Sequence, residues 1–227
     1  MKLSKRLQAI ANLIIKHKNG DSLADIGTDH AYLPCYLVEE GVIDYAYACD
    51  IASGPIKASI ETIRLNNLEN KVIPLLGSGM CPIRDKSVNM ISICGMGGKL
   101  TIDILEENKE MLDHHLFILQ SNIGLEFLRE YLYHNNMEII DEDIVKDASH
   151  IYEIIVCKKT SKTLDYDMKD FYFGPVLRQN KNELFIEKWK RQLDVQKKIL
   201  SSLDTQHEKY SEVLKLKELI EGELNEG

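Results

Sequence analysis

The sequence predicts an α/β protein in which a doubly wound, mostly parallel sheet is followed by two long helices. Short apolar runs alternate with helical patterns over the first 135 residues, which is typical of a parallel sheet covered by helices on both faces. A three- and four-residue apolar spacing then dominates the end of the chain. With 227 residues, 44% of them hydrophobic, the chain can form one sizeable domain with its own core and an appendage.

Seven apolar runs are the candidate strands, and most of the early ones are separated by helical patterns. The strands are expected at residues 22–26, 45–50, 71–76, 88–94, 116–120, 137–145 and 151–159. Helices are expected at residues 31–40, 53–66, 98–109 and 123–135, with Gly41 ending the first and Ser53 opening the second.

The last two strands are joined by a short polar link without a helix, which indicates a hairpin and therefore an antiparallel strand. A Rossmann-like sheet of seven strands with the last one antiparallel is the pattern of class I methyltransferases. Dinucleotide dehydrogenases instead have six parallel strands.

A different pattern begins after Lys159, where a polar linker and a turn at Gly174 and Pro175 precede two helical stretches. Their spacing predicts a helical coiled-coil hairpin that protrudes as an arm. We therefore expect a class I methyltransferase domain at residues 1–160 and a C-terminal helical coiled-coil arm at residues 161–227. The predicted contact stripe consists of Phe185, Trp189, Gln192, Gln196, Ile199 and Leu203 in the first helix, and Tyr210, Val213, Leu214, Leu216, Leu219 and Ile220 in the second.

The composition argues against a secreted, membrane or metal-binding protein. Residues 1–20 are basic like a signal peptide, but their apolar residues recur at helical spacing, so we expect an amphipathic helix in a cytoplasmic protein. No apolar run approaches the roughly 18 residues that a membrane span needs. The five cysteines form no C-x-x-C pair, which favours reduced thiols and no metal site.

The charge is unevenly distributed along the chain. The net charge of -8 argues against a nonspecific nucleic-acid-binding protein, yet residues 1–20 contain five Lys or Arg and no acid. Residues 158–200 also have a basic excess. Basic ends could bind a phosphate backbone, and solvated helix faces would give the same pattern.

Signals for ligand binding lie at the ends of the first four predicted strands, where open α/β sheets bind ligands. Gly27 follows the first strand and allows close approach of the backbone to a ligand. Asp50 ends the second strand, where a carboxylate either accepts hydrogen bonds from a ribose or caps the next helix. The third strand is followed by Gly77 to Met80, and the fourth runs into the glycines that begin at Gly95. Together the four ends indicate a nucleotide-like cofactor.

The missing glycines indicate which cofactor this is. A pyrophosphate site needs three glycines, whereas here Asp29 would put a negative charge where a phosphate lies. S-adenosyl-L-methionine has no phosphate, and its sulfonium tolerates a nearby carboxylate. The sequence therefore favours S-adenosyl-L-methionine.

Six motifs carry a more specific resemblance, in this order and nearly end to end: ADIGTDHAYLP, DIASGPI, ISICGMGG, LQSN, YEIIV and the FGP turn before the helical hairpin. The chain resembles the bacterial tRNA (adenine-22 N1)-methyltransferase family, TrmK. The resemblance implies methyl transfer from S-adenosyl-L-methionine to N1 of adenine 22 in tRNA, and it implies that Asp29 is needed for activity. It also implies a donor site formed by Asp25, Gly27, His30, Asp50, Ile51, Gly77, Ser78, Gly79, Met80 and Gly95.

The chain departs from the family pattern at two loops. The family's typical G-D-G-L loop is here Gly77-Ser78-Gly79-Met80, so a hydroxyl replaces the carboxylate that would accept from the donor's adenine amino group. The affinity for the donor is then lower, or a neighbouring residue accepts the hydrogen bond from the donor's adenine amino group. The family's L-Q-P-N motif has Ser121 in place of proline, while Gln120 and Asn122 are retained to hydrogen-bond a base edge.

The expected reaction is an in-line displacement at the sulfonium methyl, so catalysis depends mainly on alignment. N1 of adenine carries a lone pair and needs no base. As positive charge grows on the purine, the carboxylate of Asp29 would stabilise it. Alternatively, Asp29 only caps the next helix or binds the donor's ammonium group, and His30 either positions the base or bonds the turn backbone.

The target base is stacked in a folded tRNA and must be exposed before it reacts. We expect phosphate contacts from Lys5, Arg6, Lys188 and Arg191, and binding that depends on salt. The expected partner is tRNA, with no metal and no membrane, and the chain is expected to be a monomer unless the arm self-associates weakly. Three alternatives remain: a different RNA or a small molecule as acceptor, a catalytically inactive protein that binds S-adenosyl-L-methionine or RNA, and an oxidoreductase, which the absent G-x-G-x-x-G motif disfavours.

Overall fold

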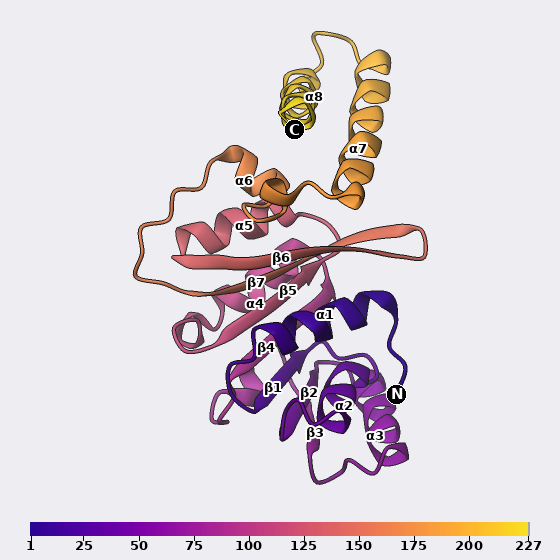
Figure 1. Cartoon of the computed structure of the whole chain (residues 1–227), viewed down its shortest axis with the longest axis vertical. Coiled ribbons are helices and arrows are strands. Elements are labelled where there is room, and N and C mark those ends of the chain that lie inside the picture. The colour runs from indigo at the N-terminus through magenta and orange to yellow at the C-terminus, as the bar shows by residue number, and fades with distance from the viewer. Residues whose placement is uncertain (227) are drawn as a thin grey trace.

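Seven strands form one mixed sheet in the computed structural model, which describes residues 1–226 (Figure 1). The strand order is β3-β2-β1-β4-β5-β7-β6, with β7 antiparallel to both of its neighbours. This confirms the predicted seven-stranded sheet. The strands are β1 (Ser22–Ile26), β2 (Tyr45–Asp50), β3 (Val72–Leu76), β4 (Met90–Met96), β5 (Leu116–Ser121), β6 (Met137–Asp147) and β7 (His150–Lys159).

Helices cover both faces of the sheet. One buried cluster joins α1 (Lys5–Lys16), α2 (Tyr32–Glu39) and α3 (Ser53–Leu65) to one set of strand residues. A second cluster joins α4 (Gly98–Glu106) and α5 (Leu125–His134) to the alternate residues of the same strands. Two short 3₁₀ turns, η1 (Cys81–Ile83) and η2 (Lys109–Met111), lie in the connections. The predicted helices are confirmed to within a few residues at their ends.

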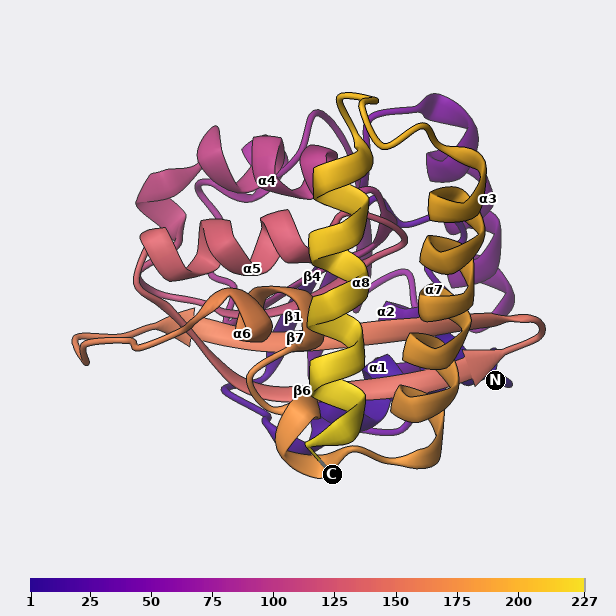
Figure 2. The same cartoon turned by 90° about the horizontal axis from the view of Figure 1, so that it is seen from above.

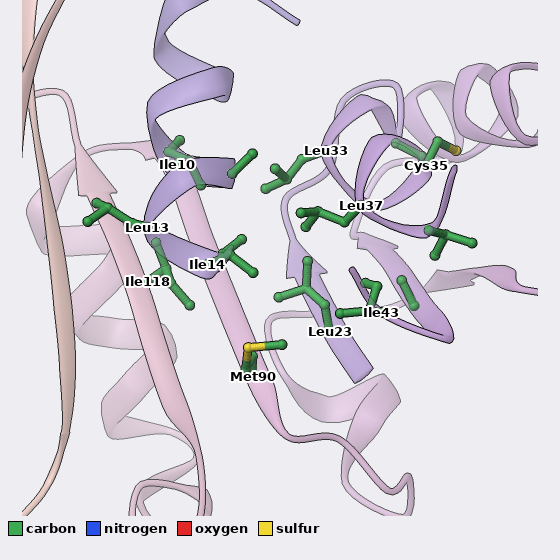
Figure 3. Close-up of a cluster of buried hydrophobic side chains, with 14 of the residues drawn as sticks. Ile10, Leu13, Ile14, Leu23, Leu33, Cys35, Leu37, Ile43, Met90 and Ile118 are labelled. Atoms are coloured by element: carbon green, nitrogen blue, oxygen red, sulfur yellow. The ribbon is translucent and has the colours of Figure 1, made fainter. Parts of the chain in front are cut away.

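Helix α1 matters for function because it carries the N-terminal residues to the carboxyl ends of the strands. The Ser4 hydroxyl caps the helix by accepting a hydrogen bond from the amide of Leu7 at 3.3 Å. Its apolar face includes Ile10 and Ile14, which lie in the same buried cluster as Ile118 of β5 (Figure 3). Each fully buried side chain of this kind contributes about 1.5–3 kcal/mol, so α1 is held firmly on the sheet.

The last part of the chain contains α6 (Met168–Phe173), a 3₁₀ turn η3 (Leu177–Asn180), α7 (Glu183–Ser202) and α8 (Tyr210–Asn225). Helices α7 and α8 lie side by side (Figure 2). Their buried residues Phe185, Trp189 and Ile220 pack together with Ile144 of β6. The base of the hairpin is therefore part of a core shared with the sheet.

The predicted stripe on α7 is only partly correct. Phe185, Trp189 and Gln196 are buried, whereas Gln192 and Ile199 are exposed. Leu193 packs against the cluster instead. The face that α7 buries is set by β6 and α6 as well as by α8, so the helix does not present the regular stripe of an isolated coiled coil.

A buried charge network connects the hairpin to the sheet. The guanidinium of Arg129 on α5 donates to Glu142 on β6 and to Glu153 on β7, both at 2.8 Å. Lys188 of α7 donates to the other carboxylate oxygen of Glu153 at 2.6 Å. Burial alone would raise the pKa of Glu153, but Lys188 and Arg129 outweigh it and lower that pKa. Two positive and two negative side chains are thus held together in the interior.

Three further features of the described residues concern membrane spans, thiols and metal ligands. Within residues 1–226, no helix is both long and apolar enough to cross a membrane. All five cysteines are free thiols. The same residues contain no cluster of three or more His, Cys, Asp or Glu side chains arranged to hold a metal ion.

Candidate donor and acceptor site

A cavity of about 500 Å³ opens at the carboxyl ends of β1 and β4, beside the start of α1. Three chain segments form its wall: the N-terminal residues, the loop between β1 and α2, and the end of β4. The lining residues are Lys2, Leu3, Ser4, Arg6, Leu7, Asp25, Gly27, Thr28, Asp29, His30, Tyr32, Leu33, Cys94 and Gly95. This is the edge of the sheet at which the sequence predicts a ligand.

The loop between β1 and α2 is pinned by backbone and side-chain hydrogen bonds. The amides of Gly27 and Thr28 donate to the carbonyl oxygen of Cys49 at 2.8 and 3.0 Å. The buried hydroxyl of Thr28 accepts from the amide of Ala31 at 3.2 Å. Gly27 has a φ of +76°, a backbone conformation that is strained for residues with a side chain, and a Cβ there would force the methyl end of Met96 to move. The loop therefore has a fixed shape with its tip at the cavity.

Asp29 and His30 form that tip. The Asp29 side chain is 82% exposed, and its carboxylate lies 3.6 Å from Nε2 of His30. The His30 ring stacks on Tyr32 with centroids 5.1 Å apart. Helix α2 begins after Ala31, which makes no side-chain capping bond, so Asp29 does not serve as the helix cap. The carboxylate is instead presented to the cavity.

Asp25 places a second carboxylate in the cavity wall, at the end of β1. It is almost fully buried and accepts a hydrogen bond from the Ser92 hydroxyl at 2.7 Å. Burial raises the pKa of Asp25, although the hydrogen bond from Ser92 opposes this. A cationic group that entered the cavity would favour the ionised form of Asp25, so this carboxylate suits the ammonium group of an amino acid.

A chain of polar contacts starts at Arg6 and runs along the cavity to the end of β4. The Arg6 guanidinium donates to Oε1 of Gln120 at 2.5 Å, and Nε2 of Gln120 donates to Oδ1 of Asn122 at 3.0 Å. Nδ2 of Asn122 then donates to the carbonyl oxygen of Gly95 at 2.9 Å. Because a guanidinium can only donate, Arg6 determines which way both amides point.

Arg6 was expected to contact tRNA phosphates, and in the structure it is engaged with other parts of the protein. The guanidinium lies over the Tyr152 ring, 5.4 Å from its centroid, and the Arg6 amide donates to Asp147 at 3.1 Å. Gln120 is fully buried with both ends of its amide engaged. Arg6 is thus part of the cavity wall, and Gln120 orients its neighbours rather than presenting a free edge.

The remaining predicted donor residues lie at the ends of β2 and β3, outside the cavity wall. Asp50 accepts a hydrogen bond from the amide of Ala52 at 2.7 Å, and its carbonyl oxygen accepts from Gly77 at 3.0 Å. Ile51, which follows β2, is 71% exposed. Ser78, which follows the neighbouring strand β3, is also exposed. The structure thus brings Asp50, Ile51, Gly77, Ser78 and Gly79 to one edge of the sheet.

Met80 was also expected at the donor site, and its side chain is fully buried in the core. It begins the 3₁₀ turn η1, which directs it inward. Met80 can therefore offer only backbone atoms to a ligand.

The four residues expected to contact phosphates differ in how far the fold leaves them available at the surface. Lys5 is exposed at the start of α1, and Arg191 is about half exposed and paired with Glu187. Lys188 points inward, and its ammonium group pairs with the buried carboxylate of Glu153. This side chain is therefore not available to RNA. The basic face of α7 is correspondingly smaller than the sequence predicts.

Eight lining residues were not among the predicted site residues: Lys2, Leu3, Ser4, Leu7, Thr28, Tyr32, Leu33 and Cys94. Lys2 carries no motif signal that distinguishes it from ordinary surface residues, whereas Thr28 lies within the ADIGTDHAYLP motif and could have been included. Cys94 lies within the CGMGG run and could have been included on that ground. Burial raises the pKa of the Cys94 thiol, so it is held as a neutral thiol.

Comparison with known proteins places this site in a family. The family described as tRNA (adenine(22)-N(1))-methyltransferase, TrmK, matches residues 23–226. The tRNA (adenine(22)-N(1))-methyltransferase of Bacillus subtilis is 36% identical over 228 residues, which cover 96% of this chain and 93% of that protein.

Solved structures agree with this assignment. The crystal structure of B. subtilis TrmK has a TM-score of 0.88 at 32% identity and covers 98% of this chain and 99% of that one. M. capricolum TrmK, in complex with S-adenosyl-homocysteine, has a TM-score of 0.89 at 28% identity, with 99% of each chain covered. A Streptococcus pneumoniae structure in complex with S-adenosyl-L-methionine has a TM-score of 0.90 at 30% identity and covers 98% and 100% of the two chains. The chain belongs to the TrmK family of tRNA (adenine(22)-N(1))-methyltransferases.

Proposed function

We propose that this chain transfers the methyl group of S-adenosyl-L-methionine to N1 of adenine 22 in tRNA, and that the transfer takes place in the cavity between β1, β4 and α1. The donor and the acceptor are assigned on the basis of membership of the TrmK family. The observation that supports the location is the pinned loop, which presents Asp29 to a cavity whose wall contains a second carboxylate, Asp25.

The residues at the strand ends fit the parts of the donor. Asp25 is a buried carboxylate suited to the ammonium group, and Gly27 lets the donor approach the backbone. Asp50 has one carboxylate oxygen bonded to Ala52 and the other placed to accept from ribose hydroxyls. Ile51 and Ser78 would flank the adenine ring. S-adenosyl-L-methionine supplies a methyl group on a positively charged sulfur.

The protein's contribution to the reaction is alignment and charge stabilisation. The adenine base would enter beside Gly95, where the Arg6-Gln120-Asn122 chain fixes the amide orientations. N1 attacks with its own lone pair while positive charge moves onto the purine. The Asp29 carboxylate at the loop tip stabilises that charge and accepts a hydrogen bond from the exocyclic amino group.

The proposal is tested by a transfer assay with purified protein, methyl-labelled S-adenosyl-L-methionine and unmodified tRNA that has adenine at position 22. After digestion to nucleosides, we expect the label in 1-methyladenosine. Label in another nucleoside would indicate a different acceptor. Donor binding without label on any tRNA would indicate an inactive binding protein.

Replacing Ser78 with aspartate restores the carboxylate that is typical of the family at this loop. Because Ser78 is exposed at the end of β3, the new side chain can accept a hydrogen bond from the donor's adenine amino group. A hydrogen bond to a charged group contributes about 1.5–3 kcal/mol, so we expect the donor Kd to fall about tenfold or more. Isothermal titration calorimetry measures this, with Ser87→Asp, before β4, as the matched control. An unchanged Kd would place the adenine elsewhere.

Replacing Arg6 with glutamine distinguishes the sequence expectation from the structural one. If Arg6 only contacts phosphates, the variant should bind tRNA more weakly with a salt slope lower by about 1. The structure predicts instead that tRNA affinity and its salt slope stay unchanged while kcat falls about tenfold, because Gln120 and Asn122 lose their fixed orientation. Filter binding at several salt concentrations and single-turnover kinetics separate the two results.

The oligomeric state and the location in the cell stay predictions. We propose that the chain acts as a monomer, which sedimentation velocity would check, and that it is cytoplasmic, which fractionation would check. Lys5 and Arg191 stay proposed contacts to the tRNA backbone.

A further inference from the structure

Ile123 projects from the loop between β5 and α5 with 74% of its surface exposed. Exposure alone says little, since Leu65 at the end of α3 is 75% exposed. Ile123 differs from Leu65 in its position, because it directly follows Asn122, the last member of the polar chain that ends at Gly95.

The backbone on both sides of Ile123 is fixed by hydrogen bonds to the end of β4. The amide of Asn122 donates to the carbonyl oxygen of Met96 at 2.8 Å, and the carbonyl oxygen of Ile123 accepts from the amide of Gly98 at 2.8 Å. A Cβ at Gly98 would lie 2.3 Å from the carbonyl oxygen of Gly124, so this close approach of α4 and α5 requires glycine. The exposed side chain is therefore carried by a rigid support.

The loops that support Ile123 also form the acceptor side of the cavity. Gly95 lines the cavity, and its carbonyl oxygen is bonded to Asn122. A Cβ at Gly97 would lie 3.6 Å from the Ile123 side chain, so Ile123 lies over the glycine run that follows β4. When an acceptor base reaches Gly95 from outside the cavity, we expect the adjacent bases of the RNA strand to lie close to the Ile123 side chain.

We propose that Ile123 is a wedge that enters the base stack next to the target adenine and fills the space that the extruded base leaves. This inference rests on the proposed function, because it requires a base that is stacked in folded RNA. Apolar side chains inserted between base steps are a common means of holding nucleic acids in an unstacked form. A rigid support suits this role, since a mobile side chain would lose entropy on insertion.

The neighbouring Phe127 is a less suitable wedge even though it is 61% exposed. It borders a surface groove that also contains Glu126 and Glu130, and two carboxylates there would repel a phosphate backbone. The assignment is therefore to Ile123, and the RNA strand is expected on the side of the loop that faces Gly97.

The test compares Ile123→Ala with the matched control Leu65→Ala on two tRNAs. In the first tRNA adenine 22 has its normal pairing. In the second the opposite nucleotide is changed so that adenine 22 is mismatched. On the normal tRNA we expect kcat/KM of Ile123→Ala to fall about 10- to 100-fold, because the cost of extrusion is no longer offset. On the mismatched tRNA the deficit should shrink to about threefold, because that base is already loosely held. Leu65→Ala should match the wild type on both, and the donor Kd should be unchanged throughout.

Two results would overturn the inference: no deficit on the normal tRNA, or an equal deficit on both tRNAs. Ile123→Phe serves as the conservative variant and should keep most of the activity, which separates a wedge from a folding defect. If the wild-type protein labels neither tRNA, the proposed function fails. If it labels both and the variants show no difference between the tRNAs, only the wedge role of Ile123 fails.

Discussion

Replacing Asp29 with asparagine is expected to lower the rate of methyl transfer about 100-fold, which is typical for the loss of one preorganised electrostatic contact. The substitution keeps the size of the side chain and removes the charge that faces the cavity. Because the loop is held by Cys49 and Thr28, its shape should not change. Single-turnover kinetics at saturating tRNA measure the effect on the chemical step.

The donor Kd of the same variant separates the two remaining roles of Asp29. An unchanged Kd with a slow chemical step supports stabilisation of charge on the purine. A large increase in Kd would mean that Asp29 binds the donor's ammonium group. The matched control is Asp21→Asn, which removes an exposed carboxylate at the opposite end of β1. Near-normal turnover of Asp29→Asn would contradict the electrostatic role.

Replacing Arg129 with alanine is expected to destabilise the protein by about 3–5 kcal/mol, because it leaves a buried charge without its partner. Arg129 has no exposed surface and lies between Glu142 and Glu153. It also donates at 3.2 Å to the carbonyl oxygens of Phe171 and Tyr172, which precede the hairpin. Chemical denaturation followed by circular dichroism measures the loss in the free energy of unfolding.

The same experiment tests the proposed division into residues 1–160 and 161–227. The network crosses that boundary through Lys188, so wild-type protein should unfold in one transition. The exposed Arg64→Ala on α3 is the control and should change the free energy of unfolding by less than about 0.5 kcal/mol. A loss of less than 1 kcal/mol for Arg129→Ala would contradict the account of the network.

Glu153 should contribute to the pH dependence of stability on the acid side, in the opposite direction to Glu142, whose pKa is raised by burial. The pKa of Glu153 is lowered in the folded protein, so its ion pairs stabilise the fold above the usual glutamate pKa. That stabilisation is lost as the pH falls through the lowered value. Arg129→Ala should weaken this acid-side dependence.

The strands and helices could be predicted because periodicity is a local property of the sequence. The alternation of apolar runs places β1 to β5 in a parallel sheet, and the short link after Asp147 indicates the antiparallel β7. The glycine and acidic positions at the strand ends were predictable for the same reason, since ligands bind where such strands end.

The sequence did not indicate in which direction the long side chains point once the helices and strands pack together. Lys188 looks like other lysines of α7, yet it pairs with the buried Glu153 because α7 packs against β6 and brings this side chain within reach of β7. Arg6 looks like part of a basic end, but the packing of α1 places it in the cavity beside Gln120. Both outcomes depend on residues more than 30 positions away, which neither spacing nor charge pattern contains.

The most direct test of the account is to locate the methyl group on the RNA. Two tRNAs that differ only in having adenine or guanine at position 22 are incubated with the protein and S-adenosyl-L-methionine, and nuclease fragments are weighed by mass spectrometry. The account predicts one added methyl group, as 1-methyladenosine at position 22, and none on the guanine tRNA. Methylation of both tRNAs, or at another position, would contradict it.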